Sequence, residues 1–252
     1  MNKVDSTELN IPAQLQKLKG SANEDGSRSC LFNLIVYTHE PRRTAYFEGI
    51  VKIIKTQFPC RIISITGNPQ AKESYFRVKM TTEKNSDGTG FACDHIYIDA
   101  TGQDLNRVYF LLMPLFVPDL PIYLLWGQDP TTEYTILPHL EYFATRLIFD
   151  AETTEDLHQF SREMLNRMAT SSIQVIDMNW ARIGGWKEVL AEVCDSQERL
   201  DQLAKASSIT LKYNNKPSDL FTHPETQAIY LQAWLAACLN WCYVNAEKND
   251  GS

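Results

Sequence analysis

The chain has 252 residues, of which 44% are hydrophobic and 22% charged, and its formal net charge is −7. This length and composition are typical of a globular protein with one large domain or two small ones. The negative charge argues against a general nucleic-acid-binding protein, because such proteins gain affinity by neutralising phosphates.

Membrane insertion and secretion are not expected. No run of about 18 apolar residues occurs, and residues 1–29 lack the apolar core of a secretory signal. The six cysteines are widely spaced and form no CxxC pair. We therefore expect reduced thiols packed in a core, and a cytoplasmic protein.

The first elements alternate between strand and helix. Residues 1–29 are predicted to be flexible or weakly helical, and a dense β-prone run predicts a strand over Cys30–Thr38. Apolar residues at helical spacing predict a helix that starts at Pro41 and ends before Pro59. A second dense strand is expected over Cys60–Thr66, so the three elements predict a parallel βαβ unit.

A hairpin and a helix are expected next. Residues 74–82 and 91–100 alternate in polarity, and the turn-prone residues 85–90 lie between them. A helix is predicted over Gly102–Met113, ended by Pro114, and a short apolar strand over Pro121–Trp126.

The second half continues the alternation. The expected elements are a short helix near residue 140, strands over Thr145–Asp150, Ile173–Met178 and Ser207–Asn214, and helices that start near Thr153, Trp186 and His223. Thr153 and Asp156 resemble a capping pair. The fold class predicted is an α/β layered fold with a mixed, partly parallel β-sheet flanked by helices. The predicted domains are 30–150 and 151–252, which either stand apart or form one continuous domain.

Standard signatures of catalysis are absent from the sequence. There is no complete GxGxxG, no GxxxxGK[ST], no GxSxG and no HExxH. Cys93 and His95 share one face of a strand, but a metal would need further ligands, so a packed pair is the favoured interpretation. We therefore expect no catalytic residue, no cofactor and no metal.

The segment "PLFVPDLPIYLLWGQDP" stands out because Pro114, Pro118 and Pro121 impose a stiff path. Asp119 lies among apolar neighbours, where a carboxylate needs donors or a cation. Candidate partners are Arg42, Arg43 and Arg146. A stiffened connection and a partner-binding loop are both open as interpretations.

The stretch "VIDMNWARIGGWKEVLAEV" is interpreted in three parts. "VIDM" is the end of a strand, Gly184-Gly185 supply a turn, and an amphipathic helix follows in which Trp186 belongs to the core. Asn179, Trp180 and Arg182 are expected in the connecting loop, where function concentrates.

The ordered motifs resemble the bacterial glucose-6-phosphate dehydrogenase assembly protein family, known as OpcA. The matching pieces run from about residue 30 to 240, and they are "FNLIVYT", "CRIISI", "CDHIYIDATG", "PLFVPDLPIYLLW", "LEYFATRLIFD", "DMNWARIGGWKEVLAEV" and "YLQAWLAACL". Two departures are Leu125, where many relatives carry a second tryptophan, and a chain shorter than some members. Redox control attributed to parts of the family is therefore not carried over to these cysteines.

The resemblance implies a non-catalytic protein that binds glucose-6-phosphate dehydrogenase and promotes its oligomerisation or activity, with no nucleic-acid or membrane partner. The alternative is a protein or enzyme that binds a sugar phosphate or nucleotide at a non-standard site. The candidate partner-binding or structural residues are Pro118, Asp119, Trp126, Arg146, Asn179, Trp180, Arg182 and Trp186.

Overall fold

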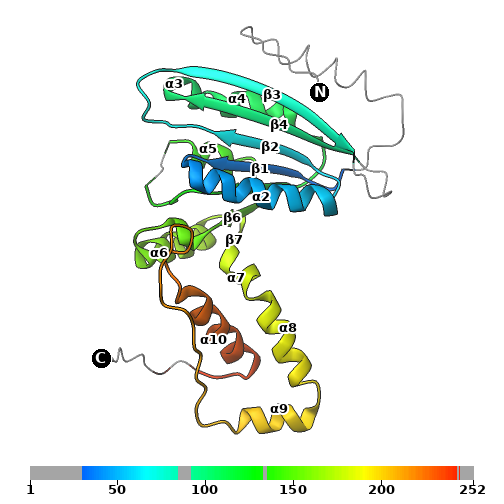
Figure 1. The fold of residues 1–252 in the computed structure, drawn as a ribbon, viewed down its shortest axis with the longest axis vertical. Coiled ribbons are helices and arrows are strands. Elements are labelled where there is room, and N and C mark those ends of the chain that lie inside the picture. Colours follow the sequence, from blue (N-terminus) through cyan, green and yellow to red (C-terminus); the bar gives the residue numbers. More distant parts are fainter. Residues whose placement is uncertain (1–29, 85–91, 133–134, 243, 245–252) are drawn as a thin grey trace. The chain divides into compact units, whose positions relative to one another are not determined.

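The computed structural model describes residues 30–84, 92–132, 135–242 and 244. Within this part of the chain, seven strands form one sheet in the order β3-β4-β2-β1-β5-β6-β7 (Figure 1). The strands are β1 (Asn33–Thr38), β2 (Arg61–Thr66), β3 (Tyr75–Lys84), β4 (Ala92–Thr101), β5 (Ile122–Trp126), β6 (Arg146–Phe149) and β7 (Gln174–Asp177). The predicted N-terminal segment 1–29 and the hairpin turn 85–90 lie outside the described residues.

The pairing of the strands confirms the predicted mixed sheet. β1 pairs in parallel with β2 and β5, β2 with β4, and β5 with β6. Among the pairs whose register is given, only β3 with β4 is antiparallel, and β3 is the first strand of the predicted hairpin. Since parallel neighbours need crossover connections, the helices between them cover the faces of the sheet.

The helices frame both faces of the sheet. In Figure 1, α2 runs along β1 on the front of the sheet, and α3, α4 and α5 lie behind the sheet. Their bounds are α2 (Pro41–Gln57), α3 (Gly102–Leu105), α4 (Val108–Leu112), α5 (Leu137–Glu141), α6 (Leu157–Thr170), α7 (Met178–Arg182), α8 (Gly184–Val193), α9 (Gln197–Ala204) and α10 (Thr226–Cys238), with 3-10 turns η1 (Met113–Leu115) and η2 (Ala151–Thr153).

The main core lies between the sheet and helices α3 to α6. Alternate strand residues such as Ile35, Ile63 and Ile96 point into it, and Leu112 and Leu140 cover them from the helices. The intervening strand residues face α2, which buries Phe47 and Val51. Both faces of the central strands are therefore buried, which explains why their sequences read as dense apolar runs.

Several predicted local features are wrong. The helix expected over Gly102–Met113 is broken into α3 and α4, and α6 is capped by the Asp156 side chain, which accepts from the N–H groups of His158 and Gln159. Thr153 ends η2 instead, and its hydroxyl donates to the Gln128 carbonyl oxygen at 2.8 Å. The single cap side chain of Asp156 thus accepts from two of the free N–H groups at the start of α6, and Thr153 takes no part in the cap.

The late strand expected over Ser207–Asn214 is also wrong, since these residues form neither strand nor helix. An alternating β-prone run becomes a strand only when a neighbouring strand accepts its backbone hydrogen bonds. In the described part of the chain, the sheet contains seven strands and this run is not one of them.

Contacts along the chain divide the protein into two compact units, Met1–Ile176 and Asp177–Ser252. Unit 1 holds the sheet, and unit 2 holds α7 to α10. The division between 30–150 and 151–252 stays a prediction from the sequence. Among the described helices, none combines the length and the apolar character needed to cross a lipid bilayer.

Candidate functional site

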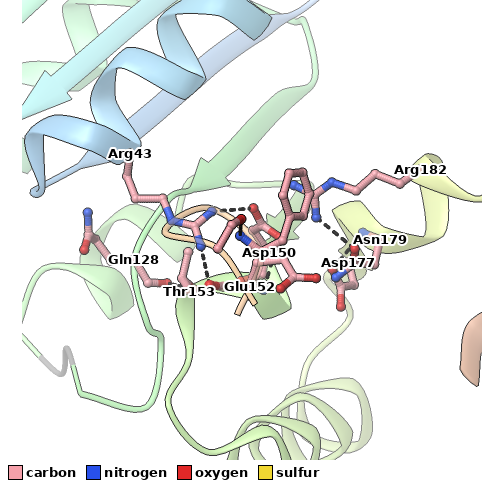
Figure 2. A network of polar contacts seen from close by, with 10 residues as sticks. Arg43, Gln128, Asp150, Glu152, Thr153, Asp177, Asn179 and Arg182 are labelled. Carbon is pink, nitrogen blue, oxygen red and sulfur yellow. Dashed lines mark hydrogen bonds and ion pairs between the residues drawn. The ribbon is translucent and has the colours of Figure 1, made fainter. Parts of the chain in front are cut away.

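A buried ion pair organises the carboxyl ends of the parallel strands in unit 1. Arg43 on α2 donates from Nη1 to the Asp150 carboxylate at 3.0 Å, and from Nη2 to the Glu152 carbonyl oxygen (Figure 2). Both side chains are almost fully buried, at 6% and 0% exposure. Asp150 follows β6 directly, and its other oxygen accepts from the Glu152 N–H at 3.2 Å. The pair therefore ties α2 to the end of β6.

The connections that follow β5 are ordered by further polar contacts. Asp129 accepts from the N–H and hydroxyl of Thr131 at 2.8 and 2.7 Å, and from the Thr154 hydroxyl at 3.0 Å. A Cβ on Gly127 would lie 2.4 Å from the Phe47 ring, so only glycine lets β5 end this close to α2. Strand ends in open α/β sheets are where ligands usually bind, but in this protein the charged groups of Arg43, Asp129 and Asp150 at these ends all bond to the protein itself.

Trp126 belongs to the core of unit 1. Its side chain is fully buried and stacks on Tyr37 with ring centroids 4.2 Å apart. The tryptophan of the proline-rich motif is therefore a packing residue on β5, and it presents no surface to a partner.

Asn33, which the sequence did not single out, holds the proline segment (residues 114–121) in place. The buried Asn33 side chain donates to the Val117 carbonyl oxygen at 3.0 Å and accepts from the Val117 N–H at 2.8 Å. Asp119 and Pro118 are exposed, so the expectation that Asp119 needs hydrogen-bond donors or a cation among apolar neighbours is wrong, because water solvates its carboxylate. Asp119 has a φ of 63°, a left-handed conformation that aspartate adopts more readily than most residues.

Two of the three arginines proposed as partners of Asp119, Arg43 and Arg146, have other partners. Arg43 pairs with Asp150, as described above. Arg146 donates from Nε and Nη2 to the Gln174 side-chain oxygen at 3.1 and 2.7 Å, and its guanidinium lies 5.1 Å from the centroid of the Tyr123 ring. Arg146 thus links β6 to β7 within unit 1.

In unit 2, the Asn-Trp-x-Arg motif forms a helix and not the expected loop. Asp177 caps α7 by accepting from the Asn179 N–H at 2.9 Å, and it also accepts from the Tyr230 hydroxyl of α10 at 2.8 Å. Burial is the main cause of a raised pKa at Tyr230, and the Asp177 charge adds to it. Asn179 is fully buried and accepts from Arg182 Nη1 at 2.9 Å (Figure 2).

Aromatic contacts complete this α7 cluster. The Arg182 guanidinium lies 5.1 Å from the Phe221 ring centroid, and Trp180 meets Tyr230 edge to face at 6.2 Å. The Lys187 ammonium lies 4.1 Å from the centroid of the Trp180 ring, which remains 42% exposed. Asn179 and Arg182 therefore act as packing residues that position the exposed Trp180.

The helix α8 presents an apolar stripe. Trp186, Val189 and Val193, which we call the α8 stripe, follow helical spacing and are 61%, 51% and 56% exposed. The prediction that Trp186 belongs to the core is wrong. Gly184 and Gly185 lie within α8 and form no turn before it. An amphipathic pattern indicates an apolar face, but the pattern does not tell whether the protein itself covers that face.

A contact between His95 and Ser64 was not predicted from the sequence. His95 on β4 is 2% exposed, and its Nε2 lies 2.7 Å from the Ser64 hydroxyl of β2. Burial lowers the pKa of His95 to about 3, and the charges of Lys55 and Lys79 add to this effect.

Among the described residues, no group of three or more His, Cys, Asp or Glu side chains has a geometry that could hold a metal ion. Cys93 of β4 contacts Cys60, which directly precedes β2, with the two sulfurs 3.5 Å apart.

Comparison with known proteins gives the family. The model described as the glucose-6-phosphate dehydrogenase subunit N-terminal domain matches residues 51–171, and the C-terminal domain of the same subunit matches residues 173–252. The junction between the two matches lies within a few residues of the boundary between units 1 and 2.

Two curated proteins show the same relationship. The chain is 25% identical over 207 residues to the putative OxPP cycle protein OpcA of Synechocystis sp., covering 81% of this chain and 42% of that protein. It is 27% identical over 201 residues to the protein of the same name from Nostoc punctiforme, covering 77% and 40%. The chain thus spans less than half the length of these relatives. Because the two family models together match most of its residues, the protein belongs to the glucose-6-phosphate dehydrogenase subunit family, known as OpcA.

Proposed function

We propose that this protein binds glucose-6-phosphate dehydrogenase and promotes its assembly or activity without doing chemistry itself. Family membership supports the choice of partner, since both matching models are described as parts of a glucose-6-phosphate dehydrogenase subunit. The observation that carries the binding role is the α8 stripe, in which a tryptophan and two valines of one helix face are more than half exposed. Exposed apolar patches of this kind mark protein interaction sites.

The mechanism needs only a difference in affinity. A protein that binds one oligomeric or conformational state of an enzyme more tightly than another shifts the population towards that state. A difference of about 1–3 kcal/mol changes such an equilibrium roughly 5- to 150-fold.

The eight candidate residues take different parts in this proposal. Trp180 and Trp186 of unit 2, and Pro118 with Asp119 of unit 1, are exposed and are proposed as contact residues. The other four have packing or hydrogen-bonding contacts within their own units and are proposed as structural residues, and they are Trp126, Arg146, Asn179 and Arg182.

The test is binding of the purified chain to its cognate dehydrogenase, followed by elution volume, isothermal titration and enzyme rate. The wild type should co-elute and change the oligomer or the rate. Trp186→Ala should weaken binding by roughly 30-fold, the effect of removing an interface hot spot of about 2 kcal/mol.

The matched control is Glu188→Ser, which lies on the opposite side of α8 and should bind as the wild type does. Unchanged circular dichroism of each variant would show that unit 2 remains folded. If the wild type neither co-elutes nor alters the rate, the proposed function is wrong. If Trp186→Ala binds as tightly as Glu188→Ser, the partner uses another surface.

A further inference from the structure

Two cysteines lie directly opposite one another at the amino ends of neighbouring parallel strands. The register of β2 and β4 pairs Arg61 with Asp94, so the residues that precede them, Cys60 and Cys93, are also neighbours. Parallel strands lie about 4.8 Å apart, within the range of Cα separations that a disulfide spans. The two sulfurs are already 3.5 Å apart, so rotation of the side chains is enough to bring them into bonding distance.

The surroundings of the pair favour a thiolate on one sulfur. Cys93 Sγ accepts from the Cys60 backbone N–H at 3.4 Å, and when protonated it donates to the Cys60 carbonyl oxygen at 2.9 Å. The hydrogen bond from the Cys60 thiol is the main cause that lowers the pKa of Cys93 to about 7, and the Lys55 charge assists. The same contact, together with burial, raises the pKa of Cys60. The pair thus contains one nucleophilic sulfur and one protonated neighbour near neutral pH.

We propose that Cys60 and Cys93 form a reversible disulfide when the protein meets hydrogen peroxide. The Cys93 thiolate attacks one peroxide oxygen, which breaks the O–O bond, releases hydroxide and leaves a sulfenic acid on Cys93. The Cys60 sulfur then attacks the sulfenic sulfur, loses its proton and displaces water. In sum, two thiols are oxidised and one peroxide is reduced to two waters.

Access to the pair sets the rate of this oxidation. Both cysteines are 2% exposed, and the short connection at Phe58 and Pro59 between α2 and β2 lies over them, with the Phe58 carbonyl oxygen 3.6 Å from Cys93 Sγ. Local opening of this connection costs less free energy than global unfolding. Peroxide therefore reaches the two thiols in the folded protein, but slowly. This inference does not depend on the proposed function.

The disulfide would close a loop across 33 positions that contains β2 and β3. Restricting a loop of this length in the unfolded chain should raise the melting temperature of unit 1 by roughly 5–10 °C. Dithiothreitol should reverse the change, because it reduces a disulfide but not a sulfinic or sulfonic acid.

The experiment treats the full chain with hydrogen peroxide, blocks free thiols by alkylation and maps the linked peptides by mass spectrometry. The result expected is a Cys60–Cys93 linkage that dithiothreitol removes, with a matching rise and fall of the melting temperature. Cys30→Ser is the matched control, because Cys30 is a half-buried thiol at the start of the same sheet and should not be needed.

Cys93→Ser should show no linkage and no rise in melting temperature. If that variant fails to fold, the linkage map of the wild type and of Cys30→Ser still decides the proposal. Peroxide treatment that leaves Cys60 and Cys93 reduced, that links either of them to Cys30, or that gives an irreversible acid on Cys93 without a linkage would overturn it.

Discussion

His95 makes the stability of unit 1 depend on pH in a way that can be worked out from its burial. The folded protein holds the imidazole neutral, because burial lowers its pKa from 6.5 to about 3. In the unfolded chain the same imidazole binds a proton below about pH 6.5. The unfolded state therefore binds more protons between pH 6.5 and pH 3, so the free energy of unfolding falls as the pH is lowered through this window.

The size of the effect follows from the two pKa values. Each pH unit below 6.5 costs about 1.4 kcal/mol until the folded pKa is reached, so lowering the pH from 7.5 to 5.0 costs about 2 kcal/mol. The loss of about 2 kcal/mol is the same for any pKa of the folded histidine below about 4, because the imidazole then remains neutral at pH 5.0.

The assay is urea denaturation of the wild type and His95→Gln at pH 7.5 and 5.0. Glutamine keeps a polar group near the Ser64 hydroxyl, which lies 2.7 Å from His95 Nε2, but it does not titrate. The wild type should lose about 2 kcal/mol more than the variant between the two pH values. His158→Gln, on the exposed face of α6, should lose as much as the wild type. Equal losses in the wild type and His95→Gln would refute the reasoning.

Substitutions at three further positions test the packing and capping of unit 1, each by urea denaturation against the wild type. Asp150→Asn should destabilise by about 3 kcal/mol, because it leaves the buried Arg43 guanidinium without its carboxylate; a loss below about 1 kcal/mol would mean that Arg43 relaxes into solvent. Asp156→Ala should cost about 1 kcal/mol through loss of the α6 cap, and Asp156→Asn should retain most of it. Gly127→Ala should cost about 1–3 kcal/mol, since its Cβ would lie 2.4 Å from the Phe47 ring; an unchanged midpoint would contradict the close approach.

The order of strands and helices in unit 1 was predictable because each central strand is buried on both faces. Such strands require uninterrupted β-branched and aromatic residues, and the helices between them require apolar residues at helical spacing. Proline reports only on the local backbone, so Pro41 marked the start of α2 correctly. The same local information misplaced the α6 cap, because Thr153 and Asp156 both suit a cap and only the helix geometry selects one of them.

The candidate site was less predictable, since it depends on which residues meet in space. The sequence singled out Asp119 and three arginines, yet Arg43 bonds to Asp150, which is 107 positions away along the chain. Asn33 and Cys60 carried no signal of their own, because their partners come from other elements of the fold.

By itself, the sequence determined the family, the layered α/β class and the parallel βαβ core, because apolar periodicity and ordered motifs are properties of the chain. Only the tertiary structure decided which apolar residues are covered. Trp126 and Trp186 both sit in apolar patterns, but one is fully buried against Tyr37 and the other is 61% exposed on α8. The physical reason is that burial depends on the surfaces that a fold brings together, and a local pattern states only which residues gain by being buried.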